Sequence, residues 1–146
     1  MSRPLFLVQD STAVALTQSV HRLSRRLRKR AALKLTPSQT SALATVERHG
    51  PLRVGELARF EQVGKSTITR LVAGLEAAGY LQRSVDPDDG RSFLVALTDQ
   101  AADALHDAAL RQHAYLTRQL EALDDADRDA LFAALPAIEK LLEVNA

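Results

Sequence analysis

The 146-residue sequence has no cysteine, no tryptophan and only 4% aromatic residues. The lack of cysteine excludes a disulfide framework, a thiolate zinc site, a cysteine nucleophile and a thiol redox sensor. Long apolar runs are also missing: the longest segments without a charged residue, 35–46 and 11–21, are well short of the roughly 20 apolar residues of a membrane helix. We therefore expect no membrane span, no signal peptide and a cytoplasmic location.

The residues that are present are typical of a helical globular protein. Hydrophobic residues make up 46% of the chain and charged residues 25%. A single domain of this length and composition buries a core without disulfide or metal support. Alanine and leucine occur 24 times each, which favours helices that pack through Leu and Ala side chains.

The charges are unevenly distributed, although the net charge is only +1. Residues 1–98 carry 15 Lys and Arg against 8 Asp and Glu, whereas residues 99–146 carry 4 against 10. A basic first two-thirds suggests a part of the molecule that meets an anionic partner such as nucleic acid. Two solvated surfaces of different charge would give the same pattern, so charge alone does not decide.

Apolar periodicity and capping signals predict a series of helices interrupted by one β-hairpin. Thr36, Pro37 and Gln39 form a capping box with proline at the first helical position, and Gly50-Pro51 ends that helix. The predicted helices span residues 10–32, 37–49, 56–60, 66–78, 99–123 and 125–144, and the predicted extended segments span residues 52–54, 80–85 and 93–97. Two short helices joined by a tight turn and followed by a hairpin indicate a winged helix-turn-helix.

The expected fold is therefore mainly α with a small β-hairpin wing. Residues 35–98 are predicted to form the winged helix-turn-helix lobe, and residues 1–34 and 99–146 the N- and C-terminal dimerisation helices. The chain ends carry more apolar positions than one small lobe can cover, which predicts a homodimer. These positions are Leu5, Phe6, Val8, Leu131, Leu135, Ile138, Leu141 and Leu142.

The helix predicted over residues 66–78 is amphipathic. On a helical wheel the core face consists of Ile68, Leu71, Val72, Leu75 and Ala78. The opposite face carries short hydroxyls and one arginine near the helix start, and only small residues further along. Its polar residues are Ser66, Thr67, Thr69 and Arg70.

This polar face is suited to the major groove of DNA. A helix in that groove needs hydrogen-bonding side chains near its N-terminus and no bulk that keeps it off the bases. Lys65 and the free amides of the first turn can meet a phosphate. A glycine in mid-helix lowers stability, so Gly74 favours a helix that approaches a partner closely over an inert polar face. The alternative interpretation is an inert polar face whose Ser and Thr act as caps.

The turn at residues 86–91 carries an arginine that turn formation does not explain. Pro87, Gly90 and the acids are ordinary turn formers, but Arg91 is not. An arginine on a protruding hairpin beside a basic helix suits the narrow, negative minor groove. Asp89, two residues earlier, is expected to brace the Arg91 guanidinium.

Together these segments resemble the core of MarR-type transcriptional regulators. The resemblance is carried by residues 64–72 (GKSTITRLV), 75–81 (LEAAGYL), Arg83, 86–91 (DPDDGR) and 95–98 (VALT). The segment 35–39 (LTPSQ) and the flanking helices also fit, so the resemblance covers most of the chain. Three positions depart from the family pattern. Gly64 replaces the usual Ser or Thr cap, Gly90 replaces a frequent second basic residue, and Ala101 replaces a usual glycine.

The resemblance implies a homodimeric repressor that binds a pseudo-palindromic site on double-stranded DNA through the 35–98 lobe. It also implies that the helix at 66–78 enters the major groove, and that Arg91 reaches the minor groove with Asp89 holding it. Many members release DNA on binding small aromatic or anionic compounds. The candidate residues for such an effector lie in the basic first helix, and they are His21, Arg22, Arg25 and Arg26.

No enzymatic activity, cofactor or metal site is expected. A glycine-rich phosphate loop, a serine elbow and paired acids with a plausible base are all missing from the sequence. Asp103, His106 and Asp107 share one helix face, but a solvated face explains them more simply than a metal site. The remaining alternative is a winged-helix module that binds protein without DNA. An apolar or acidic exposed face on the 66–78 helix would indicate such a module. The sequence leaves open the operator, the effector, the regulated genes, and whether transcription is repressed or activated.

Overall fold

The computed structural model describes the backbone of residues 6–143 and the side chains of residues 11–143. The chain forms two compact units. One, here called the lobe, comprises residues 31–109, and the other, here called the terminal unit, comprises residues 1–30 and 110–146.

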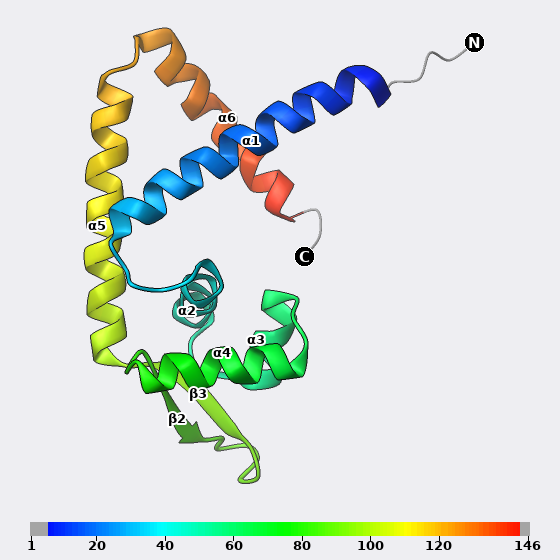
Figure 1. The fold of residues 1–146 in the computed structure, drawn as a ribbon, viewed down its shortest axis with the longest axis vertical. Coiled ribbons are helices and arrows are strands. Elements are labelled where there is room, and N and C mark those ends of the chain that lie inside the picture. The colour runs from blue at the N-terminus through cyan, green and yellow to red at the C-terminus, as the bar shows by residue number, and fades with distance from the viewer. Residues whose placement is uncertain (1–5, 144–146) are drawn as a thin grey trace. The chain divides into compact units, whose positions relative to one another are not determined.

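The predicted mainly α fold with a small β-hairpin is confirmed (Figure 1). The helices are α1 (Phe6–Ala31), α2 (Pro37–His49), α3 (Val54–Glu61), α4 (Lys65–Ala77), α5 (Asp99–Glu121) and α6 (Asp125–Glu143), and the strands are β1 (Leu52–Arg53), β2 (Leu81–Val85) and β3 (Phe93–Leu97). Helix α3 begins two residues earlier than the sequence predicts. The reason is that Glu56 accepts the backbone N–H of Arg53 at 2.9 Å and so closes a first helical turn there.

The start of α2 follows its sequence signals closely. The hydroxyl of Thr36 accepts the backbone N–H of Gln39 at 3.2 Å, and the Gln39 side chain accepts the N–H of Thr36 at 2.9 Å. Pro37 takes the first helical position. Gly50 has a φ of +77°, a conformation that L side chains rarely adopt, and it ends the helix. The predicted capping box is therefore confirmed.

The hairpin β2–β3 and the short strand β1 form one antiparallel sheet with the order β1-β3-β2. Val85 pairs with Phe93, which leaves residues 86–92 to form the tip of the wing. Leu52 and Arg53 pair with Val95 and Leu94, so β1 connects the wing to the start of α3. The segment predicted as a short extended piece thus becomes the third strand of the sheet.

The core of the lobe is formed by helices α2, α3 and α4 packed against this sheet. Its largest fully buried side chains are Leu43, Val46, Leu57, Ile68, Val72, Leu75 and Val95. Full burial of one such side chain contributes about 1.5–3 kcal/mol. The predicted core face of α4 is confirmed for Ile68, Val72 and Leu75, and Leu71 is partly buried. The assignment of Ala78 to this face is wrong, because the helix ends at Ala77 and Ala78 is exposed.

The terminal unit consists of α1, the second half of α5, and α6. The Gln112 side chain donates to the Leu27 carbonyl at 3.2 Å, and the Arg30 guanidinium lies 4.8 Å from the centre of the Tyr115 ring. Arg128 donates to the carbonyls of Leu120 and Leu123 at 3.1 and 2.9 Å, which joins the end of α5 to α6. Among the described residues, none of the helices combines the length and hydropathy that a membrane span requires.

Candidate nucleic-acid interface

The first two turns of α4 present the predicted reading face to solvent. Lys65, Ser66, Thr67, Thr69 and Arg70 are all exposed. The N-cap residue is Gly64, which has no side chain to accept the first amides of the helix. These backbone amides therefore remain available to an external acceptor. The face combines these free N–H donors with the cationic side chains of Lys65 and Arg70.

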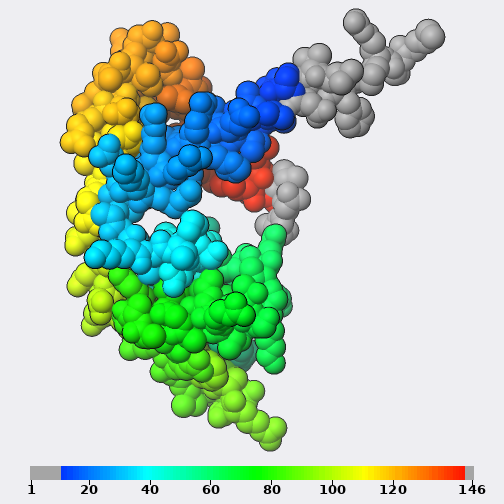
Figure 2. Space-filling model, viewed as in Figure 1, coloured from blue at the N-terminus to red at the C-terminus, as the bar shows by residue number. Residues whose placement is uncertain are grey.

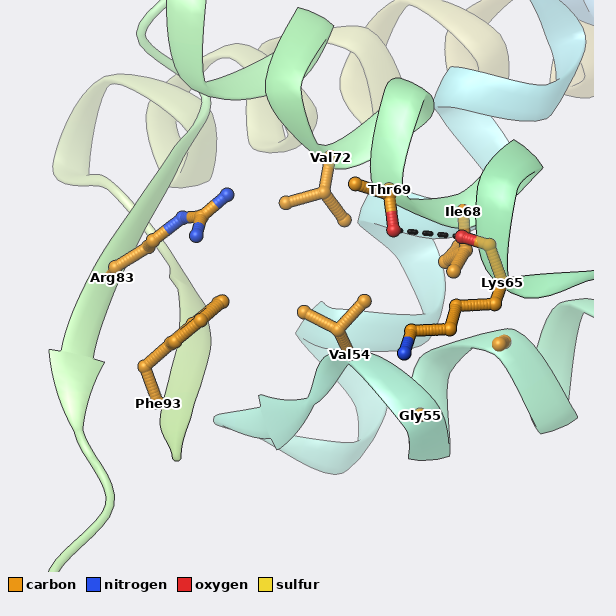
Figure 3. A pocket seen from close by; sticks show the side chains of 9 residues that line it. Val54, Gly55, Lys65, Ile68, Thr69, Val72, Arg83 and Phe93 are labelled. Carbon is orange, nitrogen blue, oxygen red and sulfur yellow. Dashed lines mark hydrogen bonds between the residues drawn. The ribbon is translucent and has the colours of Figure 1, made fainter. Parts of the chain in front are cut away.

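One hydroxyl of this face is already engaged within the helix. The Thr69 hydroxyl donates to the Lys65 carbonyl at 2.7 Å (Figure 3). Thr69 can therefore offer a partner its oxygen as an acceptor more readily than its proton. Ser66 and Thr67 have exposed side chains at the helix start, where a partner can reach them.

The tip of the wing is ordered by Asp89, although not in the way expected from the sequence. Asp89 accepts the backbone N–H of Arg91 at 3.0 Å, and its carbonyl accepts the backbone N–H of Ser92, also at 3.0 Å. No ion pair joins Asp89 to the Arg91 guanidinium among the described side chains. A carboxylate that accepts the backbone N–H two residues later closes a local turn. This hydrogen bond gives the Asp89 carboxylate a partner without the Arg91 guanidinium. Asp89 thus shapes the turn, and the exposed Arg91 side chain projects from it.

The base of the wing is held by a buried carboxylate that sequence reasoning missed. Asp86 is only 3% exposed. It accepts from the Arg53 Nε at 2.5 Å, from the Ser92 hydroxyl at 3.2 Å and from the Asp88 N–H at 2.9 Å. The hydrogen bond from Arg53 is the main cause that lowers the pKa of the Asp86 carboxyl, and it also raises the pKa of Arg53. In the sequence Asp86 is an ordinary turn former, and no spacing rule links it to Arg53.

Arg83 connects the wing to α4. Its guanidinium forms an ion pair with Glu76 of α4 and lies 4.1 Å from the centre of the Phe93 ring. Figure 3 shows the Arg83 side chain extending above this ring. The sequence marks Arg83 only as part of a family pattern, and the structure shows its contacts. The wing, which Figure 2 shows projecting from the lobe, is thus fixed at its base by Arg53 and Arg83.

Two adjoining hollows lie between the wing and the helices of the lobe. The first has a volume of about 560 Å³ and a mostly apolar lining (Figure 3). It is lined by Val54, Gly55, Ala58, Lys65, Ile68, Thr69, Val72, Arg83 and Phe93. The second has a volume of about 510 Å³ and is lined by Arg53, Val54, Gly55, Glu56, Arg59, Arg91, Ser92 and Phe93.

The predicted effector residues all lie on α1. His21, Arg22, Arg25 and Arg26 are exposed. Arg22 and Arg26, one helical turn apart, line a shallow hollow of about 330 Å³ together with Ser19 and Leu23. His21 and Arg25 are not part of its lining. The structure thus brings two of the four side chains together.

The comparisons with known proteins agree with this geometry. The family model described as "MarR family" matches residues 35–93. An uncharacterised HTH-type transcriptional regulator from Mycobacterium bovis is 33% identical over 129 residues, which cover 88% of this chain and 90% of the relative. A putative transcriptional regulator from Pseudomonas aeruginosa has a similar structure, with a TM-score of 0.81, 28% identity and coverage of 93% and 96% of the two chains.

A second similar structure contains DNA. It is a MepR mutant from S. aureus bound to an oligodeoxyribonucleotide, with 19% identity, a TM-score of 0.68 and coverage of 90% and 97% of the two chains. At this identity the likeness concerns the fold. The Mycobacterium relative, in contrast, shares a third of its residues over nearly the whole chain, and the family model matches the lobe. The chain therefore belongs to the MarR family of HTH-type transcriptional regulators, which are not enzymes.

Proposed function

We propose that this protein binds double-stranded DNA as a homodimer and represses transcription from a pseudo-palindromic operator. The observation that carries the proposal is the exposed start of α4, where Lys65, Ser66, Thr67, Thr69 and Arg70 surround uncapped amides. In this proposal α4 lies in the major groove, and Arg70 and the hydroxyls meet base edges. Lys65 and the helix amides meet phosphates.

The wing supplies the second contact of the proposal. Arg91 is exposed at a hairpin tip whose backbone is fixed by Asp89 and whose base is fixed by Asp86. A cation on such a narrow projection fits the negative minor groove. Asp89 acts on this contact through the shape of the turn.

Homodimerisation is proposed for the terminal unit. Its helices expose large apolar side chains at many positions of α1, α5 and α6, and such faces are normally covered by a partner. The exposed residues are Val14, Leu16, Val20, Leu23, Leu110, Leu131, Phe132, Leu135, Ile138, Leu141 and Leu142. Three predicted contributors, Leu5, Phe6 and Val8, lie outside the described side chains. A two-fold dimer presents two lobes, which requires an operator with two related half-sites.

Release by a small aromatic or anionic compound is the regulatory part of the proposal. Arg22 and Arg26 line one hollow on α1 and can pair with a carboxylate or phenolate. His21 and Arg25 lie on the same helix and complete the proposed effector set. A DNA-release screen of small aromatic acids tests this, with Arg22→Ala and Arg25→Ala as separate variants. If the acids release DNA equally from both variants and from the parent, these arginines do not hold the effector.

The second candidate function is a winged-helix module that binds protein without DNA. The observation that favours it is Phe60 of α3, which is 52% exposed and stacks on His49 with ring centres 4.2 Å apart. The start of α4 opposes it, because that face carries hydroxyls and cations and neither an acidic nor a large apolar side chain.

Titration of mixed-sequence duplex DNA at two salt concentrations separates the two functions. A DNA-binding regulator acting in the cytoplasm binds such duplexes, and its affinity falls steeply as salt rises. A protein-binding module does not bind them at either salt concentration.

A further inference from the structure

The second hollow of the lobe has basic side chains on both walls. Arg59 comes from α3, Arg91 from the wing and Arg53 from β1. Arg59 and Arg91 are exposed, and within residues 11–143 no carboxylate forms an ion pair with either guanidinium. Two opposed and unpaired cations on the walls of a hollow of about 510 Å³ are suited to an anion.

Two acids near this hollow, Glu56 and Asp86, are engaged in hydrogen bonds. Glu56 lines it, but its carboxylate accepts the backbone N–H of Arg53 at 2.9 Å. Asp86 is buried and accepts the Nε of Arg53 and the Ser92 hydroxyl. The Arg53 side chain stays 46% exposed, so its remaining guanidinium N–H groups are open to the hollow's contents. The lining of the hollow thus carries three arginines, Arg53, Arg59 and Arg91, and one carboxylate, that of Glu56.

The hollow also has free space beside α3. A Cβ placed on Gly55 would meet no atom within 4 Å. Gly55, Val54 and Phe93 line both hollows, so the two adjoin, and they are here together called the channel. This channel runs from Lys65 and Thr69 of α4 to Arg91 of the wing.

The position of the channel matches a necessary feature of duplex DNA. One sugar-phosphate strand always separates a major groove from the adjacent minor groove. If α4 reads the major groove and Arg91 enters the neighbouring minor groove, that strand must cross the space between α4 and the wing. The channel occupies this space, and its basic end is the hollow of Arg53 and Arg59.

We propose that the hollow between α3 and the wing binds a phosphodiester group of this intervening strand, held by Arg59 and Arg53. This inference rests on the proposed function and adds two residues to the DNA interface. The contact is independent of sequence, since the two arginines meet a phosphate and not a base edge. It fixes the position of the strand, and thereby the register in which α4 and Arg91 meet their grooves.

The first test is the salt dependence of DNA affinity for Arg59→Gln. The variant loses affinity by the same factor on specific and scrambled duplexes, and its log–log salt slope is shallower by about 0.9 for each half-site. Arg118→Gln is the control, because it removes the same charge from an exposed position of the terminal unit and leaves the slope unchanged. A slope for Arg59→Gln equal to that of the parent overturns the proposal.

The second test places a charge in the hollow without disturbing the fold. Gly55→Glu and Gly55→Gln add side chains of the same size to open space, and an acid in the first turn of a helix does not destabilise it. Thermal melting checks that both variants fold. We expect Gly55→Glu to bind DNA at least 10-fold more weakly than Gly55→Gln at low salt, and this ratio to shrink at high salt. Equal affinity of the two variants contradicts a phosphate in the hollow.

The outcomes separate the inference from the function on which it rests. If the parent binds no duplex DNA, the proposed function fails and the inference fails with it. If the parent binds DNA and the Arg59 and Gly55 variants match their controls, only the inference fails.

Inorganic phosphate is added as a competitor in a third arm. If free phosphate binds the parent but not Arg59→Gln, while the DNA salt slope is equal in both, the hollow is a small-anion site and the proposal is wrong.

Discussion

At the scale of single residues, the side chains proposed to contact DNA differ from the side chains that hold the wing and α4 in place. Lys65, Arg70 and Arg91 are exposed and carry no ion pair among the described residues. Asp86 and Asp89 are acids at the interface, and both are turned inward to hydrogen bonds that shape the wing. The charge of Asp86 is matched by Arg53, whereas Asp89 is engaged only by a backbone N–H.

Arg70 is the residue whose substitution best distinguishes base reading from backbone binding. If Arg70 meets a guanine edge, Arg70→Ala loses about 1–3 kcal/mol on the specific site and discriminates less between sequences. The exposed side chain makes little contribution to stability, so the melting temperature stays close to that of the parent. Titration on specific and scrambled duplexes measures both affinities. Unchanged binding on both would remove Arg70 from the interface.

Asp86 gives a prediction about acid stability. Its pKa in the folded protein lies below the ordinary value of 3.8, so its contribution to stability is present above that pH and is lost as the pH falls through the folded pKa. Asp86→Asn lacks this contribution and melts at a lower temperature at neutral pH. The difference from the parent shrinks on acidification below the ordinary value.

Thermal melting of the parent and the variant measures this difference. The measurements run from about pH 7 to about pH 3 and so cross the ordinary carboxylate pKa. Asp88→Asn is the control, since it removes the same charge from an exposed position two residues away. A constant difference over the whole pH range, or an equal effect of Asp88→Asn, would show that the Arg53–Asp86 pair does not stabilise the wing through its charge.

At the scale of elements, the wing is a projection joined to the rest of the lobe at two points. Arg53 attaches it to β1 through Asp86, and Arg83 attaches it to α4 through Glu76. Orientation of the wing relative to α4 is therefore set before DNA is met, which reduces the ordering cost of binding.

The wing prediction compares changes at its tip. Arg91→Ala weakens DNA binding and leaves the melting temperature nearly unchanged, because an exposed turn arginine contributes little to stability. Asp89→Ala weakens binding less, through loss of the turn hydrogen bond to the Arg91 amide. Asp89→Asn retains an oxygen acceptor for that amide and keeps most of the affinity.

Affinity and melting temperature are measured for the three variants together. If Asp89→Asn is as weak as Asp89→Ala, the charge of Asp89 matters more than the turn, and a direct brace of the guanidinium becomes the better account. If Arg91→Ala melts much lower while each folded molecule binds normally, Arg91 is a structural residue.

The elements themselves follow from local signals, whereas the contacts between them do not. The capping box of Thr36 and Gln39 and the hairpin around Pro87 and Gly90 act over a few residues, so the sequence predicts them. The Arg53–Asp86 pair joins residues 33 positions apart. Only the pairing of β1 with β3 brings the two residues together, and a two-residue strand has too little pattern to predict that pairing.

The candidate site shows the same division. Exposure of Ser66, Thr67, Thr69 and Arg70 follows from helical periodicity, and the structure agrees at each position. The expected brace from Asp89 to the Arg91 guanidinium does not form among the described side chains, because the carboxylate of Asp89 accepts the backbone N–H of Arg91 instead. Periodicity predicts which way a side chain faces, but not which of several donors it binds.

At the scale of the whole molecule, the proposed function requires two copies of the chain. Leu135 and Ile138 of α6 are 53% and 46% exposed in one copy, and Leu141 and Leu142 are more exposed still. In the proposed complex a single lobe meets one half-site with few base contacts. A dimer would double these contacts and fix the spacing between them.

The dimer prediction uses Leu135→Lys. The charge is added at an exposed position, so the single chain still folds, but a partner surface can no longer cover it. We expect the parent to sediment as a dimer at micromolar concentration and the variant to shift toward monomer and lose DNA affinity. Gln119→Lys, which adds the same charge at an exposed polar position of α5, is the control. A parent that sediments as a stable monomer contradicts the dimer.

DNA reading through α4 is tested by selection of bound duplexes from a random pool with the unmodified protein. The account predicts enrichment of two inverted half-sites whose centres lie about 10–10.5 base pairs, or a multiple of that, apart. It also predicts that Arg70→Ala enriches a less defined sequence within each half-site at the same spacing. Enrichment of no sequence, or of a single unpaired half-site, would contradict a dimer that reads DNA through α4.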